Sequence, residues 1–88
     1  MNAAELSQRM ASEAASIAQY LFPNGKRVAG EWRVGGTSGE PGQSLGIRLT
    51  GAKAGVWADF ASGEKGDLLD AWAAVRGCSI AEAIREAK

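Results

Sequence analysis

The segment that decides the fold of this chain is Val56-Trp57-Ala58-Asp59-Phe60-Ala61-Ser62-Gly63-Glu64-Lys65-Gly66-Asp67-Leu68-Leu69-Asp70. Its first five residues predict a strand, and the two glycines that follow predict a turn. Asp67 is a favoured residue for capping the start of a helix, and Gly77 is a favoured residue for ending one. The segment therefore predicts a strand that leads through a short turn into a helix.

The residues before this segment predict an N-terminal helix and two further strands. Apolar residues recur at helical spacing, with Asn2 as the N-terminal cap and Pro23-Asn24-Gly25 as the end of one continuous helix over 1–25. The apolar stripe consists of Leu6, Met10, Ala14, Ile17 and Leu21. Alternation over 26–34 and 44–50 predicts two strands, joined by a flexible connection rich in glycine and serine.

Each predicted strand has one face towards the core and one towards solvent, because successive side chains point to opposite sides. In the first strand one face consists of Val28, Gly30, Trp32 and Val34, and the other of Arg27, Ala29, Glu31 and Arg33. In the second strand the inward residues are Leu45, Ile47 and Leu49, with Arg48 outward. Trp57 alternates with Val56, Ala58 and Phe60, so we expect it on the outer face.

The C-terminal residues predict a second helix after Gly77. Ser79 and Glu82 have the spacing of a capping box, in which each side chain accepts a hydrogen bond from the other residue's backbone N–H. The chain is then a single α+β domain over 1–88, with an N-terminal helix (1–25), an antiparallel meander of about three strands (26–62) and a helix pair (66–88).

The deciding segment and the tail Arg76-Gly77-Cys78-Ser79-Ile80-Ala81-Glu82-Ala83 resemble the CHC-type zinc-ribbon domain of bacterial and phage DNA primases. In that family an aromatic strand runs through Cys-x-x-Cys into Gly-Asp and a helix, and Gly66-Asp67 matches the last part. Asp59 and Ser62 stand at the two cysteine positions, and Gly35 and Ser38 align with the family's Cys-x-x-His pair. The resemblance covers roughly 26–87 and implies a zinc-ribbon-like fold that has lost its four ligands.

Composition excludes several kinds of site. The chain has no histidine and one cysteine, Cys78, so it cannot assemble a tetrahedral zinc site or an intramolecular disulfide. No serine or cysteine has a histidine base, which makes catalysis by this chain improbable. No apolar run approaches the length of a membrane span, and no secretory signal opens the chain. We expect a non-enzymatic cytoplasmic protein without a cofactor.

Formal net charge is zero, but residues 26–53 carry five basic side chains and two acidic ones. Outward cations on neighbouring strands can contact phosphates, and an adjacent aromatic ring can stack on an unpaired base. The candidate nucleic-acid-binding residues are Arg27, Arg33, Arg48, Lys53 and Trp57. The alternative is that the cations are ordinary solvated charges and that Trp57 packs under the first helix.

The resemblance implies a non-catalytic module that contacts template DNA, single-stranded by expectation, as does the N-terminal domain of a primase or primase-helicase. The chain would be either the amino-terminal module of a longer primase or a free-standing phage or mobile-element protein. The alternative is a small regulator or inhibitor that binds a host replication or defence protein through the same surface.

A chelator should leave the melting temperature of the protein unchanged. Structural zinc contributes roughly 10–16 kcal/mol of apparent binding free energy in small modules, and its removal unfolds them. Here buried aromatic side chains are expected to supply that stabilisation instead. Thermal unfolding followed by circular dichroism, with and without EDTA, checks this expectation, and a drop of many degrees would contradict it.

Overall fold

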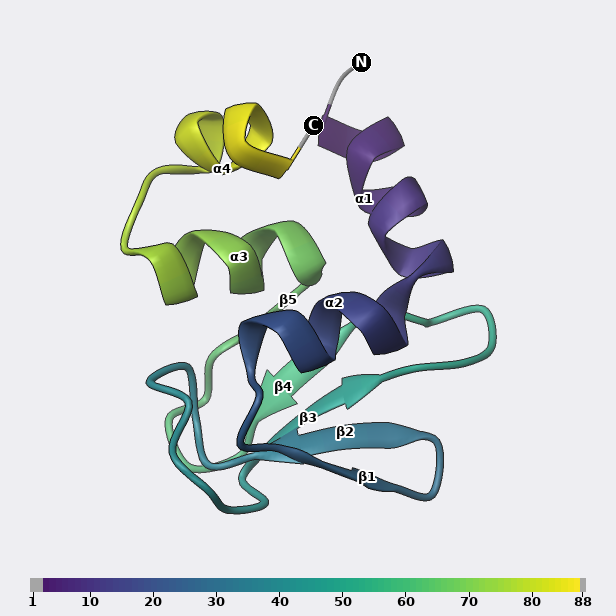
Figure 1. Ribbon diagram of the computed structural model, residues 1–88, viewed down its shortest axis with the longest axis vertical. Helices are drawn as coiled ribbons and strands as arrows, with labels where there is room; N and C mark the ends of the chain where they lie inside the picture. The colour runs from purple at the N-terminus through teal and green to yellow at the C-terminus, as the bar shows by residue number, and fades with distance from the viewer. Residues whose placement is uncertain (1–2, 88) are drawn as a thin grey trace.

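The structure, a computed structural model, describes residues 3–87 apart from the side chains of residues 3, 7 and 87. Within these residues, four helices lie on one side of a five-stranded antiparallel sheet (Figure 1). The helices are α1 (Ala3–Ser12), α2 (Ala14–Leu21), α3 (Leu68–Arg76) and α4 (Ile80–Ala87). The strands are β1 (Lys26–Val28), β2 (Glu31–Val34), β3 (Leu45–Arg48), β4 (Trp57–Asp59) and β5 (Lys65–Gly66). The α+β class and the antiparallel meander are confirmed.

The sheet has five strands in place of the predicted three. The predicted strand over 26–34 is a hairpin, in which β1 pairs with β2 and Lys26 lies opposite Arg33. Its two turn residues, Ala29 and Gly30, have φ of 54° and 97°. Positive φ at both central residues is what a tight two-residue hairpin requires. The fifth strand forms because Lys65 and Gly66 fold back and pair with Ala58 and Trp57.

The N-terminal segment forms two helices, so the predicted continuous helix is wrong at Glu13. This residue leaves helical geometry (φ −123°, ψ 34°) between α1 and α2. Just before it, the Ser12 hydroxyl donates a hydrogen bond to the Arg9 carbonyl, a local bond that competes with the backbone ladder and bends helices. The break lets both helices pack against α3. The predicted cap, Asn2, lies outside the described residues.

The core lies between the helices and the inward face of the sheet. α3 is its centre, since it packs against α1, α2 and α4 and also contacts β5. The largest fully buried side chains are Phe22, Val34, Leu45, Ile47 and Leu68. Four of the predicted inward residues, Val34, Leu45, Ile47 and Leu49, are therefore confirmed in the core.

Helix α3 begins and ends, and helix α4 begins, where the sequence predicts. Asp67 accepts a hydrogen bond from the Asp70 backbone N–H at 2.9 Å, and Asp70 accepts one from the Asp67 N–H at 3.0 Å. Gly77 adopts the left-handed conformation at the end of α3. The Ser79 hydroxyl caps α4 by accepting the Glu82 N–H at 3.2 Å. Local sequence alone is enough to set these helix ends.

Two indole N–H groups attach helix ends to the sheet. The Trp32 ring nitrogen donates to the Phe22 carbonyl, at the end of α2, at 2.9 Å. The Trp57 ring nitrogen donates to the Asp67 carbonyl, at the start of α3, at 2.6 Å. Trp57 is only 3% exposed, so the expectation that it lies on the outer face is wrong. The register explains the difference, because Trp57 pairs with the inward residue Ile47 and directly opposed residues share a face.

Replacing Trp57 by phenylalanine should lower the free energy of unfolding by about 2 kcal/mol. The smaller ring leaves space in the core, and the Asp67 carbonyl loses the indole donor while it keeps the hydrogen bond from the Ala71 N–H. Urea unfolding followed by circular dichroism measures the change. The control is Val56→Ala, at the exposed neighbouring position, which should stay within about 0.5 kcal/mol of the parent protein. Equal stability of W57F and the parent would show that the indole N–H contributes nothing.

Candidate nucleic-acid interface

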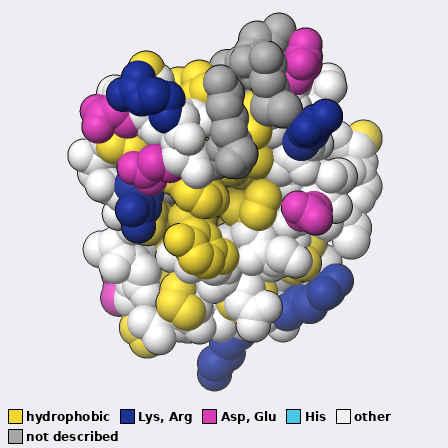
Figure 2. Space-filling model, turned by 45° about the horizontal axis from the view of Figure 1, so that its top comes forward, with side chains coloured by type: hydrophobic (Ala, Val, Ile, Leu, Met, Phe, Trp, Pro, Cys, Tyr) yellow, Lys and Arg dark blue, Asp and Glu magenta, His cyan; other side chains and the backbone are white. Residues whose placement is uncertain are grey.

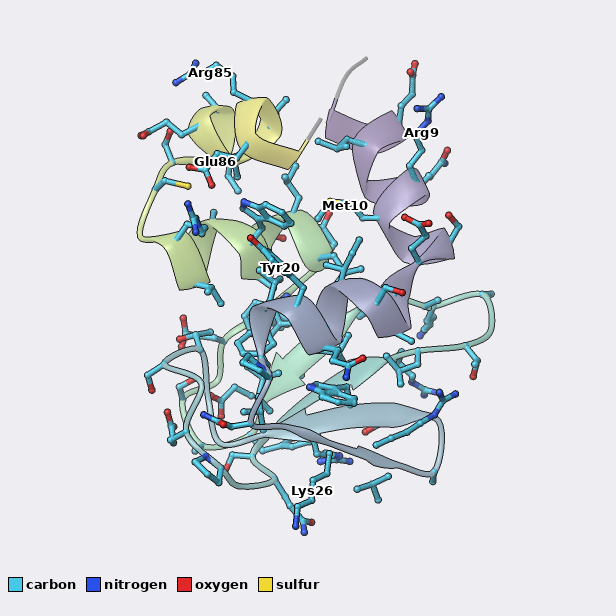
Figure 3. The ribbon with its side chains drawn as sticks, viewed as in Figure 1. Arg9, Met10, Tyr20, Lys26, Arg85 and Glu86 are labelled. Carbon is cyan, nitrogen blue, oxygen red and sulfur yellow. The ribbon has the colours of Figure 1, made fainter. Side chains whose placement is uncertain are left out.

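The side of the sheet that faces away from the helices is here called the open face. Ten residues lie on it. The strand register places Lys26, Val28, Glu31, Arg33, Gly46, Arg48, Ala58 and Lys65 there, and Val56 and Phe60, which flank β4, line the same surface. Figure 3 shows one of them, Lys26, projecting away from the helical side of the molecule. Four of the ten are cationic and one, Glu31, is anionic. The open face is therefore the basic side of a chain whose formal net charge is zero.

Arg33 makes three contacts with its neighbours near the open face. Its guanidinium donates to the Gln43 carbonyl at 3.0 Å and pairs with the Glu31 carboxylate at 2.7 Å. The guanidinium carbon also lies 6.0 Å from the centre of the Phe60 ring, which is within cation–π range. These contacts fix the position of the cation before any ligand arrives.

Arg48 is the freer of the two arginines on the open face. Its side chain is 58% exposed, and its Nε lies 3.9 Å from Glu31 Oε2, beyond hydrogen-bond distance. An exposed pair at this distance contributes little stability. Arg48 can therefore turn towards an incoming anion at small cost.

Gly46 leaves the space in which Glu31 and Arg33 meet. It lies opposite Arg33 in the β2–β3 pair. A Cβ atom at this position would lie 2.8 Å from Glu31 Oε1, closer than Cβ atoms approach such a group, and 3.1 Å from Arg33 Nε, which is a tight contact. Because Gly46 has no side chain, the centre of the open face has space for the Glu31–Arg33 ion pair.

Phe60 is the exposed aromatic ring of the open face. It follows β4, and its backbone N–H donates to the Ser44 carbonyl at 2.9 Å, which anchors the residue to the sheet. The residue is 78% exposed, the largest value among the exposed large apolar residues. An aromatic ring in water beside a guanidinium is a surface on which a planar ligand can stack.

The structure brings together two of the five predicted binding residues. Arg33 and Arg48 share the open face and the same acidic neighbour. Arg27 lies opposite Trp32 and so belongs to the other face, because the hairpin at Ala29 reverses the chain. Lys53 is in the turn between β3 and β4, where its carbonyl accepts the Val56 N–H. The fifth predicted residue, Trp57, is buried.

Sequence reasoning missed three contributors to the open face: Phe60, Lys26 and Lys65. The period-two pattern did group Phe60 with Val56 and Ala58, but that group was assigned to the core. The large Trp57 indole buries more apolar area than any one residue of the other face. This signal could have assigned Trp57 to the core and Phe60 to the outer face. Lys26 lies on the open face because of the β1–β2 hairpin, and Lys65 lies there because β5 pairs with β4. The sequence offers weaker signals for these two elements.

The four positions that align with zinc ligands lie in two turns at one end of the sheet. Asp59 is buried, and its Oδ1 accepts the backbone N–H of Ala61 at 2.9 Å and of Ser62 at 3.3 Å. In the other turn the Ser38 hydroxyl donates to Glu40, which lowers the pKa of that carboxyl. No group of three or more His, Cys, Asp or Glu in the described part of the chain could hold a metal ion. These residues do not fit zinc.

The helical side carries a stacked pair of aromatic rings. Tyr20 of α2 stacks on Trp72 of α3 with ring centres 5.5 Å apart, and Trp72 donates to Glu86 at 3.1 Å. Figure 2 shows apolar side chains gathered in the middle of this side, with charges of both signs around them. Burial raises the pKa of the nearby Cys78 thiol, with Glu86 and Glu82 acting in the same direction, so the thiol stays protonated and unreactive at neutral pH.

Comparison with known proteins does not assign this chain to a family. No protein-family model, curated protein or solved structure matches this chain. Across residues 3–87, the helices are all too short or too polar to cross a bilayer. The open face is therefore interpreted from its own geometry.

Proposed function

We propose that the open face binds single-stranded nucleic acid and that the chain is a non-catalytic nucleic-acid-binding module. The observation that carries the proposal is the exposed Phe60 ring beside Arg33, on a sheet face that no helix in residues 3–87 covers. An aromatic ring for base stacking and cations for phosphates are the two components of a single-strand platform.

Charge on the open face favours a polyanion. Lys26, Arg33, Arg48 and Lys65 give four positive charges against the one negative charge of Glu31, a local balance of +3. The whole chain carries ten basic and ten acidic residues, so the rest of the molecule carries the compensating negative charge. Such separation orients a nucleic acid towards one face without attracting it to the others.

The geometry favours an unpaired strand over a duplex. A stacked aromatic ring needs the flat side of a base, which an intact duplex buries between neighbouring base pairs. The described helices lie on the opposite side of the sheet, so none of them is placed to enter the major groove of DNA lying on the open face. Single-stranded template DNA, as expected from the primase resemblance, is the ligand that suits this surface.

A metal-free relative of the primase zinc ribbon is our proposal for the origin of the fold. The proposal is supported by the short distance between the turn that follows β2 and the turn that follows β4. A Cβ atom on Gly36 would lie 3.3 Å from Asp59 Oδ2. Turns that carry ligand pairs must lie this close to share one ion. The bonds from Ala61 and Ser62 to Asp59 now close the second turn without a metal. On this proposal the module acts in DNA replication, within a primase or in a phage or mobile-element protein.

Replacing Phe60 by alanine should weaken binding of single-stranded DNA about tenfold, the effect of removing one base–aromatic stack. Fluorescence anisotropy with a labelled oligothymidine at low salt measures the dissociation constant. The matched control is Tyr20→Ala, which removes a ring of similar exposure from the helical side. If the two substitutions weaken DNA binding equally, the open face is not the binding site.

Replacing Arg48 by alanine should reduce the salt dependence of the same binding. Removing one cation that neutralises a phosphate changes the slope of log K against log salt by about 0.7 for a single strand. A salt titration of R48A against the parent measures this difference. Arg85→Ala is the control, because Arg85 lies at the far end of the molecule from Lys26 (Figure 3). A slope that falls in R85A and stays constant in R48A contradicts the proposal.

A protein partner on the same surface is the second candidate. The observation in its favour is that three apolar residues of the open face, Val28, Val56 and Phe60, are exposed. Apolar exposure with neighbouring charge is also typical of protein interfaces. A small regulator that binds a replication or defence protein would use this patch, and no binding of nucleic acid even at low salt favours that function.

A further inference from the structure

A shallow hollow lies in the open face between Phe60 and Val56. Its lining includes the side chains of Glu31, Arg48, Val56, Ala58 and Phe60, with Gly46 in the floor. Gly46 and Ala58 face each other across the β3–β4 pair, so the floor is flat and apolar. Val56 and Phe60 flank β4 on either side, and an extended chain of four residues spans about 13 Å. That spacing leaves room for one planar ring system.

The carboxylate of Glu31 stands at the edge of this floor. Its Oε1 is engaged by Arg33 at 2.7 Å, and its Oε2 lies 3.9 Å from Arg48, outside hydrogen-bond range. An ionised carboxylate accepts hydrogen bonds and cannot donate them. The group is partly shielded, with 30% of its side chain exposed, so a ligand edge that meets it must offer an N–H.

We propose that the hollow binds one unpaired base and that Glu31 selects bases with an exocyclic amino group over thymine and uracil. The inference rests on the proposed function, and it adds the identity of the base that the open face prefers. Cytosine N4 donates to Glu31 Oε2 while its ring lies over Gly46 and Ala58. Adenine and guanine also carry amino groups, whereas thymine and uracil place a carbonyl oxygen where cytosine has its amine.

Glu31 acts here as a selecting residue in addition to being a counter-ion for the arginines. A thymine O4 directed at the carboxylate leaves two acceptors facing each other without a proton between them. Arg48, close by and loosely paired, can contact the phosphate of the same nucleotide. On this proposal, Glu31 selects the base, although its negative charge lowers the attraction of the open face for phosphate.

The test compares short oligomers of deoxycytidine and deoxythymidine, two pyrimidines of similar size, at neutral pH and low salt. The parent protein should bind the cytidine oligomer about fivefold more tightly, the effect of one net hydrogen bond. In Glu31→Gln the preference should fall below about twofold, because a glutamine amide also donates and so tolerates the thymine oxygen. Glu13→Gln, the same change between α1 and α2, should keep the full preference.

Each outcome bears on a different statement. Equal binding of the two oligomers by the parent protein overturns the base selection and leaves the proposed function standing. A preference that persists in E31Q overturns the role of Glu31. If neither oligomer binds, the proposed function falls and the inference falls with it. A further measurement, backbone NMR of the parent protein with the cytidine oligomer, should shift the Gly46 and Ala58 amides, and shifts confined to α2 and α3 overturn the site.

Discussion

The inward position of Trp57 is the constraint on which the rest of the structure depends. Its indole fills the core opposite Ile47, and its N–H holds the Asp67 carbonyl at the start of α3. Because side chains alternate along a strand, this one assignment sends Val56, Ala58 and Phe60 to the opposite face. The same contact therefore anchors the central helix and exposes the aromatic ring of the candidate binding surface.

The hairpin between β1 and β2 is the second determinant of the surface. A turn of two residues changes which side chains of β1 share a face with those of β2, so Lys26 joins Arg33 and Arg27 faces the other way. Ala29 at φ 54° is an unusual residue for this turn, since side chains with a Cβ disfavour the left-handed region. The favourable pairing of the two strands across the hairpin offsets that local cost.

The ion pairs of the open face add little to the stability of the fold. Glu31 lies between Arg33 and Arg48 at unequal distances, so it pairs closely with Arg33 and only loosely with the exposed Arg48. Exposed pairs of this kind contribute at most about 1 kcal/mol each. Stability comes from the apolar core around α3, so the charges on the sheet can change while the fold is kept. This separation lets one small domain carry both a rigid scaffold and an adaptable surface.

Sequence by itself determined the α+β class, the apolar stripes of β2 and β3, both ends of α3 and the start of α4, because caps and alternation are local properties of the chain. It also indicated Arg33 and Arg48 as outward cations. Only the tertiary structure decided which face of β4 is buried, that residues 26–34 form a hairpin, and that the N-terminal helix breaks at Glu13. The buried face of β4 and the pairing of β1 with β2 depend on packing against other parts of the chain, and the break at Glu13 accompanies a local hydrogen bond from Ser12 to Arg9 that the apolar stripe does not indicate.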